Sequence, residues 1–126
     1  MAVGIYVDGS GSPRGGFGWL VKETGKSHYE KRDNVTNNQA EYMAIISAVL
    51  HARSRSGEPP YDDVVIYSDS QNTVKQLNHE HVINNEALRE LARQCWSEIA
   101  GFGDSRRPDV RWISRKENPA GKMLGS

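Results

Sequence analysis

The chain begins with segments in which apolar and polar residues alternate, which is the period of a half-buried β-strand. Residues 2–8, with the sequence AVGIYVD, form the first such segment. Two more follow at residues 17–23 and 27–32, with the turn residues TGK between them. This arrangement predicts a three-stranded antiparallel meander at the start of the chain.

Helical spacing of apolar residues replaces this alternation farther along. Thr36, followed three residues later by Gln39, has the form of a capping box, which predicts a helix over residues 37–55. A short helix is predicted over residues 70–78. A longer amphipathic helix is predicted over residues 85–103, because its apolar side chains fall on one face.

Two further strands alternate with these helices. Residues 64–69 form a nearly continuous apolar run, typical of a buried central strand, and residues 109–114 form the fifth strand. The order β-β-β-α-β-α-α-β predicts an α/β fold, in which helices flank a five-stranded mixed sheet made of the antiparallel meander plus parallel strands. The tryptophans lie in these patterned elements, so we expect all three in the hydrophobic core: Trp19, Trp96 and Trp112.

Length and composition limit the class of protein. At 126 residues the chain is expected to form one domain with an ordinary core. Its 16 acidic and 16 basic residues lack the basic excess of a strong non-specific nucleic-acid binder, and favour a small molecule or a locally focused contact with a polyanion. The single cysteine, Cys95, excludes a disulfide framework and a cysteine-based zinc site. We expect a cytoplasmic monomer, since we find neither a signal peptide nor an apolar run of membrane-spanning length.

Two acidic residues occupy matching places in the predicted sheet. Asp8 and Asp69 each end an apolar strand, and each lies two residues after a tyrosine. If these strands are parallel neighbours, the two carboxylates meet at the carboxyl ends, near Glu41 at the start of the first helix. Each acid alone is more simply explained as a turn residue or, for Glu41, as an acid favoured by the helix dipole. The matched pair together with Glu41 favours a functional site.

Three converging carboxylates repel one another unless a cation neutralises them. A site with oxygen ligands alone suits Mg²⁺ or Mn²⁺. Such ions are typical of phosphate chemistry, where two of them stabilise the attacking and leaving oxygens of an in-line displacement. We therefore expect a divalent cation, Mg²⁺ or Mn²⁺, at this edge of the sheet.

Three motifs connect these acids to a known family. The segments YVDGSGSP…GGFGW, TNNQAEYMA and IYSDSQ, in this order and spacing, resemble the type 1 ribonuclease H family, and VRWISRKENPAGKML is a weaker fourth match. The resemblance covers nearly the whole chain and implies a ribonuclease H-like fold, in a single domain over residues 1–126. It implies a truncated or short C-terminal helix and no basic handle, since residues 78–83 leave no room for one.

The resemblance also implies an activity and a set of site residues. The activity is endonucleolytic hydrolysis of the RNA strand of an RNA–DNA hybrid, leaving 5′-phosphate and 3′-hydroxyl ends, with two Mg²⁺ or Mn²⁺ ions. Asp8 would bridge both ions, while Glu41 and Asp69 would hold the ion on the leaving-group side. The residues implied to contact the hybrid are Gly9, Ser10 and Gly11 near RNA 2′-hydroxyls, Thr36 at a DNA phosphate, Asn37 and Asn38 in the minor groove, and Ser70.

The fourth carboxylate of the family is replaced in this chain. Against the usual family ending, NPAGKMLG places Lys122 at the acid, or Gly121 if the register slips by one. Three hypotheses compete: Asn118 supplies a neutral amide oxygen to the metal, Glu117 supplies its carboxylate, or no group does. We favour Asn118 among the three. It is equally well explained as the N-cap of a short helix with Pro119 at the first position.

Two other classes of function compete with the nuclease. One is a catalytically weak or inactive module that binds a hybrid or double-stranded RNA. The other is a structure-specific nuclease of the same fold. The intact set of Asp8, Glu41 and Asp69 argues against the binding module, because clustered acids that hold no cation only repel a phosphate backbone.

Overall fold

The computed structural model describes residues 1–54, 61–103 and 107–123. Its five-stranded sheet has the order β3-β2-β1-β4-β5. β2 pairs antiparallel with both β1 and β3, whereas β4 pairs parallel with both β1 and β5. The strands are β1 Ala2–Ser10, β2 Gly16–Val21, β3 Ser27–Lys31, β4 Asp63–Ser68 and β5 Asp109–Trp112. The predicted mixed sheet of a meander plus parallel strands is confirmed.

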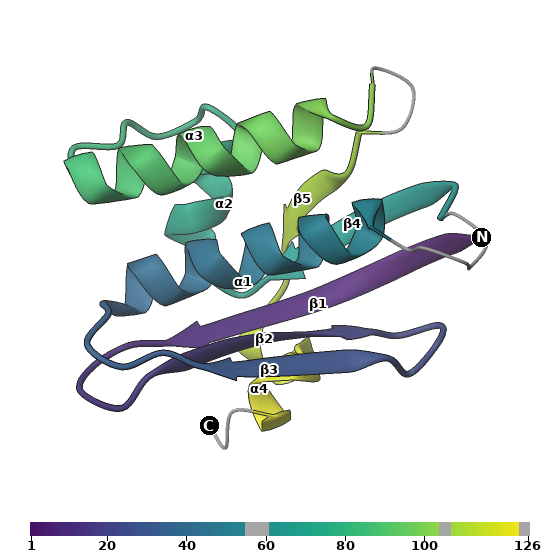
Figure 1. Cartoon of the computed structure of the whole chain (residues 1–126), viewed down its shortest axis with the longest axis horizontal. Helices are drawn as coiled ribbons and strands as arrows, with labels where there is room; N and C mark the ends of the chain where they lie inside the picture. Colours follow the sequence, from purple (N-terminus) through teal and green to yellow (C-terminus); the bar gives the residue numbers. More distant parts are fainter. Residues whose placement is uncertain (55–60, 104–106, 124–126) are drawn as a thin grey trace.

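Helices pack on both sides of this sheet. They are α1 Asn37–Arg53, α2 Gln71–Leu77, α3 Glu86–Ala100, the one-turn 3₁₀ helix η1 Arg115–Glu117, and α4 Ala120–Met123. Figure 1 shows α1 along one face of the sheet and α3 on the outer side of α1, while α4 lies below β1 and β2. Among the described residues, no helix is long and apolar enough to cross a membrane.

The hydrophobic core lies between the sheet and α1. Val3, Ile5 and Val7 alternate along β1 and are buried, as the sequence pattern predicts. Ile45 and Val49 of α1 are fully buried in the same cluster. Burying side chains of this size contributes about 1.5–3 kcal/mol each. The first helix is therefore fixed against β1, which places the start of α1 next to the carboxyl end of that strand.

The predicted capping box sets where α1 begins. The Thr36 hydroxyl oxygen accepts a hydrogen bond from the Gln39 amide at 3.1 Å, and the Gln39 side-chain oxygen accepts one from the Thr36 amide at 2.9 Å. This pairing satisfies two main-chain donors that the first turn of a helix leaves free. The helix ends at Arg53 with Ser54 as its cap, two residues before the predicted end at residue 55, which lies outside the described residues.

One prediction about the core is wrong. The sequence pattern predicts that Trp112 lies in the hydrophobic core, but Trp112 is 50% exposed. The reason is that Trp112 is the last residue of β5, and β5 is an edge strand of the sheet. Trp19 is buried as predicted, and Trp96 is partly buried against the core.

Two glycines allow β1 to approach the start of α1 closely. A Cβ atom added to Gly9 would lie 2.4 Å from the carbonyl carbon of Ala40 and 2.6 Å from the amide nitrogen of Glu41. A Cβ on Gly11 would lie 2.2 Å from the carbonyl carbon of Thr36. These distances are too short for any side chain, so main chain packs directly on main chain. This contact brings Asp8 beside Glu41.

We expect Gly9→Ala to lower the free energy of unfolding by about 1–3 kcal/mol, because the added methyl group collides with the main chain of α1. Gly4→Ala in the same strand is the matched control. There the nearest atom is a ring carbon of Tyr67 at 3.2 Å, which can move. Urea unfolding of the two variants checks the difference, and equal losses would contradict the close packing at Gly9.

Candidate active site

Three acidic side chains from three elements meet at one edge of the sheet. Asp8 lies near the carboxyl end of β1, and Asp69 directly follows β4. The two strands are parallel with Val7 opposite Ser68, so the aspartates are neighbours. Glu41 comes from the start of α1. One carboxylate oxygen from each residue lies within 4.8 Å of the others, so the predicted convergence of these acids is confirmed.

Burial and mutual repulsion change the acidity of this cluster. Glu41 is 5% exposed and Asp8 is 3% exposed. Burial, followed by the charges of Asp8 and Asp69, raises the pKa of Glu41 to about 9. Burial and the charge of Asp69 also raise the pKa of Asp8. Without a cation, therefore, the cluster of carboxylates retains a proton at neutral pH.

The cluster has the chemistry of a cation site. Among the described residues, Oδ1 of Asp8 and Oε2 of Glu41 are buried without any hydrogen-bond partner. Buried polar atoms are nearly always paired, so two unpaired carboxylate oxygens in one cluster call for a positive partner. An all-oxygen set of donors fits Mg²⁺ or Mn²⁺. The residues present thus fit the divalent ion that the sequence pattern predicts.

A cavity of about 300 Å³ lies at this cluster. It gathers eight of the residues predicted for the site, from β1, α1 and the β4–α2 turn: Asp8, Gly9, Ser10, Asn37, Asn38, Glu41, Asp69 and Ser70. Gly11 and Thr36 do not line the cavity but adjoin it. The Gly11 amide donates to the side-chain oxygen of Asn37 at 2.7 Å, and Thr36 caps α1.

Arg115 also lines the cavity, and it was not predicted. Its Nε atom lies 3.9 Å from Oδ2 of Asp69, and its side chain is 75% exposed. Its charge counteracts part of the rise in the pKa of Asp8. Its position three residues after the last strand could have indicated a place at the site. The carboxyl ends of neighbouring parallel strands lie at the same edge of a sheet. The site therefore combines three acids with an exposed guanidinium group.

Asn118 is buried beside the cluster and presents its nitrogen to it. The Nδ2 atom donates to the carbonyl of Val7 at 2.9 Å and to Oδ2 of Asp69 at 3.1 Å. The Oδ1 atom accepts from the amide of Ala120 at 3.1 Å. The carbonyl of Val7 can only accept and the amide of Ala120 can only donate, so these partners select this orientation of the amide. Glu117 is exposed and lies outside the acid cluster.

The arrangement at Asn118 corresponds to the N-cap alternative raised by the sequence. A metal ligand role for its oxygen would require the amide to turn over and give up the bonds to Val7 and Ala120. The ligand role stays a prediction. Lys122, at the position of the family acid, lies in α4. Gly121, which takes that position if the register slips by one, is buried and carries no side chain that could bind a cation.

The sequence of this chain matches a family profile and a curated protein. The family profile described as RNase H matches residues 1–114, a range that includes all three acids. A ribonuclease HI of Halobacterium salinarum is 36% identical in an alignment of 109 positions, which covers 81% of this chain and 53% of that protein. The chain thus spans about half the length of this curated relative.

Solved structures share the fold. The crystal structure of RNase H1 from Halobacterium salinarum superposes with a TM-score of 0.83 at 27% identity, covering 98% of this chain and 94% of that one. LC11-RNase H1 in complex with an RNA/DNA hybrid superposes with a TM-score of 0.81 at 21% identity, covering 97% and 92%. With the profile match over most of its length and a relative above one third identity, the chain belongs to the RNase H family.

Proposed function

We propose that this chain is an endoribonuclease that hydrolyses the RNA strand of RNA–DNA hybrids and leaves 5′-phosphate and 3′-hydroxyl ends. The observation that carries the proposal is the cluster of Asp8, Glu41 and Asp69, with two unpaired buried oxygens, in a member of the RNase H family. The similarity to a ribonuclease HI and to an RNase H1 crystallised with a hybrid supports the choice of substrate.

The three acids are the proposed ligands of Mg²⁺ or Mn²⁺. Such ions, when bound, supply Lewis-acid polarisation of the phosphate and a water of lowered pKa. The chain's own part is to fix the ligand oxygens and to exclude water around Asp8 and Glu41, both of which are buried. If two ions bind, Asp8 would be a ligand to both, and Glu41 and Asp69 would hold the one on the leaving-group side, as the resemblance to the family implies.

The other residues of the cavity are proposed to hold the hybrid. Four polar side chains line the cavity and offer hydrogen-bond donors and acceptors for sugar and base edges: Ser10, Asn37, Asn38 and Ser70. The Gly9–Gly11 main chain would approach the RNA 2′-hydroxyls, and Thr36, at the N-terminus of α1, would meet a DNA phosphate. The exposed guanidinium group of Arg115 is suited to a phosphate near the cleavage site.

For Asn118 we propose a role as a hydrogen-bond donor that fixes the carboxylate of Asp69. Its two bonds through Nδ2, to Asp69 and to Val7, support this role over that of an oxygen ligand. Without a fourth acid, the second ion would have fewer protein ligands than in the usual family site. This proposal therefore predicts that the protein binds the second ion more weakly, or that it prefers Mn²⁺.

Substituting Asn118 separates the two roles. If Asn118 is a donor, Asn118→Asp should lower Mg²⁺-dependent cleavage about threefold to tenfold, because a hydrogen bond of ordinary strength is lost and a carboxylate then faces Asp69. Asn118→Ala should lower it as well. Asn78→Asp is the control, since Nδ2 of Asn78 donates to the carbonyl of Val110 outside the acid cluster. A gain of activity in Asn118→Asp would instead establish the ligand role.

A substrate panel tests the proposed activity. RNA–DNA hybrid, duplex DNA and duplex RNA, labelled on either strand, are incubated with the protein in Mg²⁺ and in Mn²⁺. Cleavage of the RNA strand of the hybrid alone, with 3′-hydroxyl ends, is the expected result. Binding of the hybrid without cleavage in Mn²⁺ would instead identify a catalytically weak or inactive binding module, and cutting of duplex DNA a structure-specific nuclease.

We also propose that the chain acts as one RNase H domain without a basic handle, as a monomer in the cytoplasm. Residues 78–85 form the short connection between α2 and α3, where a handle would have to be inserted. The acids and the cavity around them come from a single chain. The one cysteine, Cys95, is buried as a free thiol, which suits a reducing compartment.

A further inference from the structure

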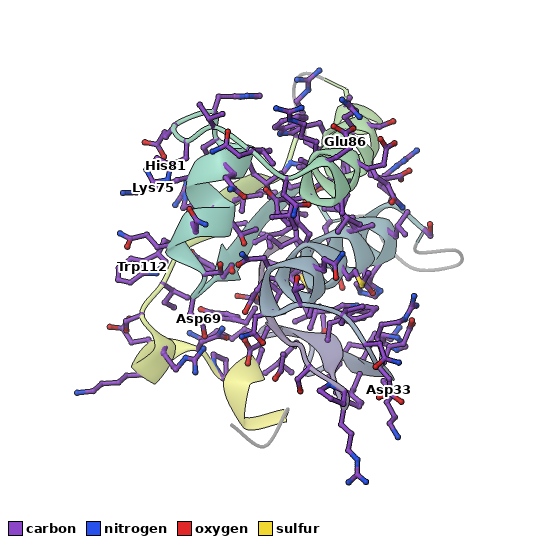
Figure 2. The ribbon with its side chains drawn as sticks, turned by 90° about the vertical axis from the view of Figure 1, so that its left-hand side faces the viewer. Asp33, Asp69, Lys75, His81, Glu86 and Trp112 are labelled. Carbon is purple, nitrogen blue, oxygen red and sulfur yellow. The ribbon has the colours of Figure 1, made fainter. Side chains whose placement is uncertain are left out.

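Trp112 is exposed to solvent, yet it is bonded to the candidate active site. It ends β5 opposite Ser68 of β4 and is 50% exposed. Its indole Nε1–H donates to the main-chain carbonyl of Asp69 at 3.3 Å. Figure 2 shows Trp112 on the same side of the molecule as Asp69. We propose that Trp112 is a positioning residue that holds Asp69 in place for binding a divalent cation, an inference that rests on the proposed function.

Asp69 lies in a two-residue turn between β4 and α2, where regular hydrogen bonding is interrupted. On the strand side, the amide of Ile113 donates to the carbonyl of Ser68 at 3.0 Å, and the Ser68 hydroxyl accepts from the amide of Ser70 at 3.1 Å. On the helix side, the first main-chain bond runs from Val74 to the carbonyl of Ser70. The carbonyl of Asp69 takes part neither in the hydrogen bonds of the sheet nor in those of α2. The indole N–H of Trp112 donates to it instead.

The last residue of β5 and the segment that follows this strand therefore hold Asp69 at both its main chain and its side chain. Trp112 bonds its carbonyl, and Asn118 bonds its carboxylate at 3.1 Å. The Asp69 side chain is only 2% exposed, so its carboxylate has a narrow choice of positions. The bond from Trp112 restrains the main chain at Asp69, from which the carboxylate extends. Ligand groups work only when held close to their productive geometry, so a loosened Asp69 should bind a cation less tightly.

Trp112→Phe tests this role because it keeps an aromatic ring and removes the N–H donor. Titration calorimetry with Mn²⁺ alone should show a dissociation constant about threefold to tenfold higher than in the parent, the loss expected for one ordinary hydrogen bond. Hybrid cleavage should show a lower kcat at limiting Mn²⁺, with KM for the hybrid within about twofold of the parent. Replacing Trp112 by benzothienylalanine, which keeps the bicyclic shape and lacks the N–H, should have the same effect if the Phe variant folds poorly.

Trp96→Phe is the matched control. Its indole Nε1–H also donates to a main-chain carbonyl, that of Leu77 at 3.0 Å, but it does so away from the acids. A purely structural role for the indole bond would lower the melting temperature of both variants and leave the Mn²⁺ affinity of both unchanged. The proposal requires weaker Mn²⁺ binding in the Trp112 variants and parent-like binding in Trp96→Phe.

The outcomes separate this inference from the proposed function. If the parent binds Mn²⁺ and the Trp112 variants bind it equally well, the positioning role is wrong while the proposed function stands. If Trp96→Phe weakens Mn²⁺ binding as much as Trp112→Phe, the role is also wrong, because the effect is then not specific to Asp69. A parent that binds no Mn²⁺ overturns the proposed function and this inference with it.

Discussion

Replacing Asp8 by Asn is expected to reduce cleavage of an RNA–DNA hybrid by at least about a hundredfold, which is the scale on which loss of one charge-stabilising group acts in an enzyme site. Asp8 is 3% exposed and lies within the cluster formed with Glu41 and Asp69. An amide of the same shape keeps the packing and removes the negative charge that attracts a cation. The initial rate of cutting of a labelled RNA strand in Mn²⁺ measures the effect.

The Asp8 variant should be at least as stable as the parent when no metal is present. Removing one of three crowded carboxylates relieves their repulsion, so its melting temperature should not fall. Asp63→Asn is the matched control, because Asp63 is exposed at the opposite end of β4. Equal rates in the parent and in Asp8→Asn, whether high or at background, would contradict the catalytic role.

The metal-free protein is expected to lose stability as the pH rises from about 4.5 toward 9. The pKa of Glu41 is raised from 4.5 to about 9 in the folded protein. Between these values the folded chain binds a proton that the unfolded chain has released, so rising pH favours unfolding. One such proton gives a slope of at most about 1.4 kcal/mol per pH unit. Urea unfolding with a chelator at several pH values measures the slope.

Glu41→Gln and added metal should each remove this dependence. The Gln variant carries no proton to lose, so it should be more stable than the metal-free parent at pH 8 and nearly independent of pH over this range. Saturating Mn²⁺ should stabilise the parent more at pH 8 than at pH 5, because the cation binds the deprotonated form. Glu90→Gln on the exposed face of α3 is the control. The same slope in Glu41→Gln as in the parent would show that another group retains the proton.

The acid cluster could be predicted from the sequence because its positions follow from element boundaries. Asp8 and Asp69 mark the ends of two apolar strands, and their carboxylates meet because these strands are parallel neighbours in the sheet. Thr36 and Gln39 mark where α1 begins, which places Glu41 near the same edge. Strand ends and helix starts are local properties, so the pattern of residues along the chain was sufficient to locate the cluster.

The segment after β5 could not be predicted in the same way. The bond from Asn118 to the carbonyl of Val7 joins residues 111 positions apart, and no local pattern specifies which amide atom faces Asp69. Periodicity identifies β5 but not its place at the edge of the sheet, which is why Trp112 was assigned to the core. Arg115 is separated from Asp69 by 46 positions of sequence, and only the folded sheet brings the two to 3.9 Å.

The most direct test of the metal site is anomalous diffraction from crystals of the protein soaked in Mn²⁺. The proposed function predicts an anomalous peak within coordination distance of carboxylate oxygens of Asp8, Glu41 and Asp69, with the nitrogen of Asn118 still directed at Asp69. If crystals soaked in saturating Mn²⁺ show no anomalous peak at the three carboxylates, the assignment of this cluster as the catalytic metal site is wrong.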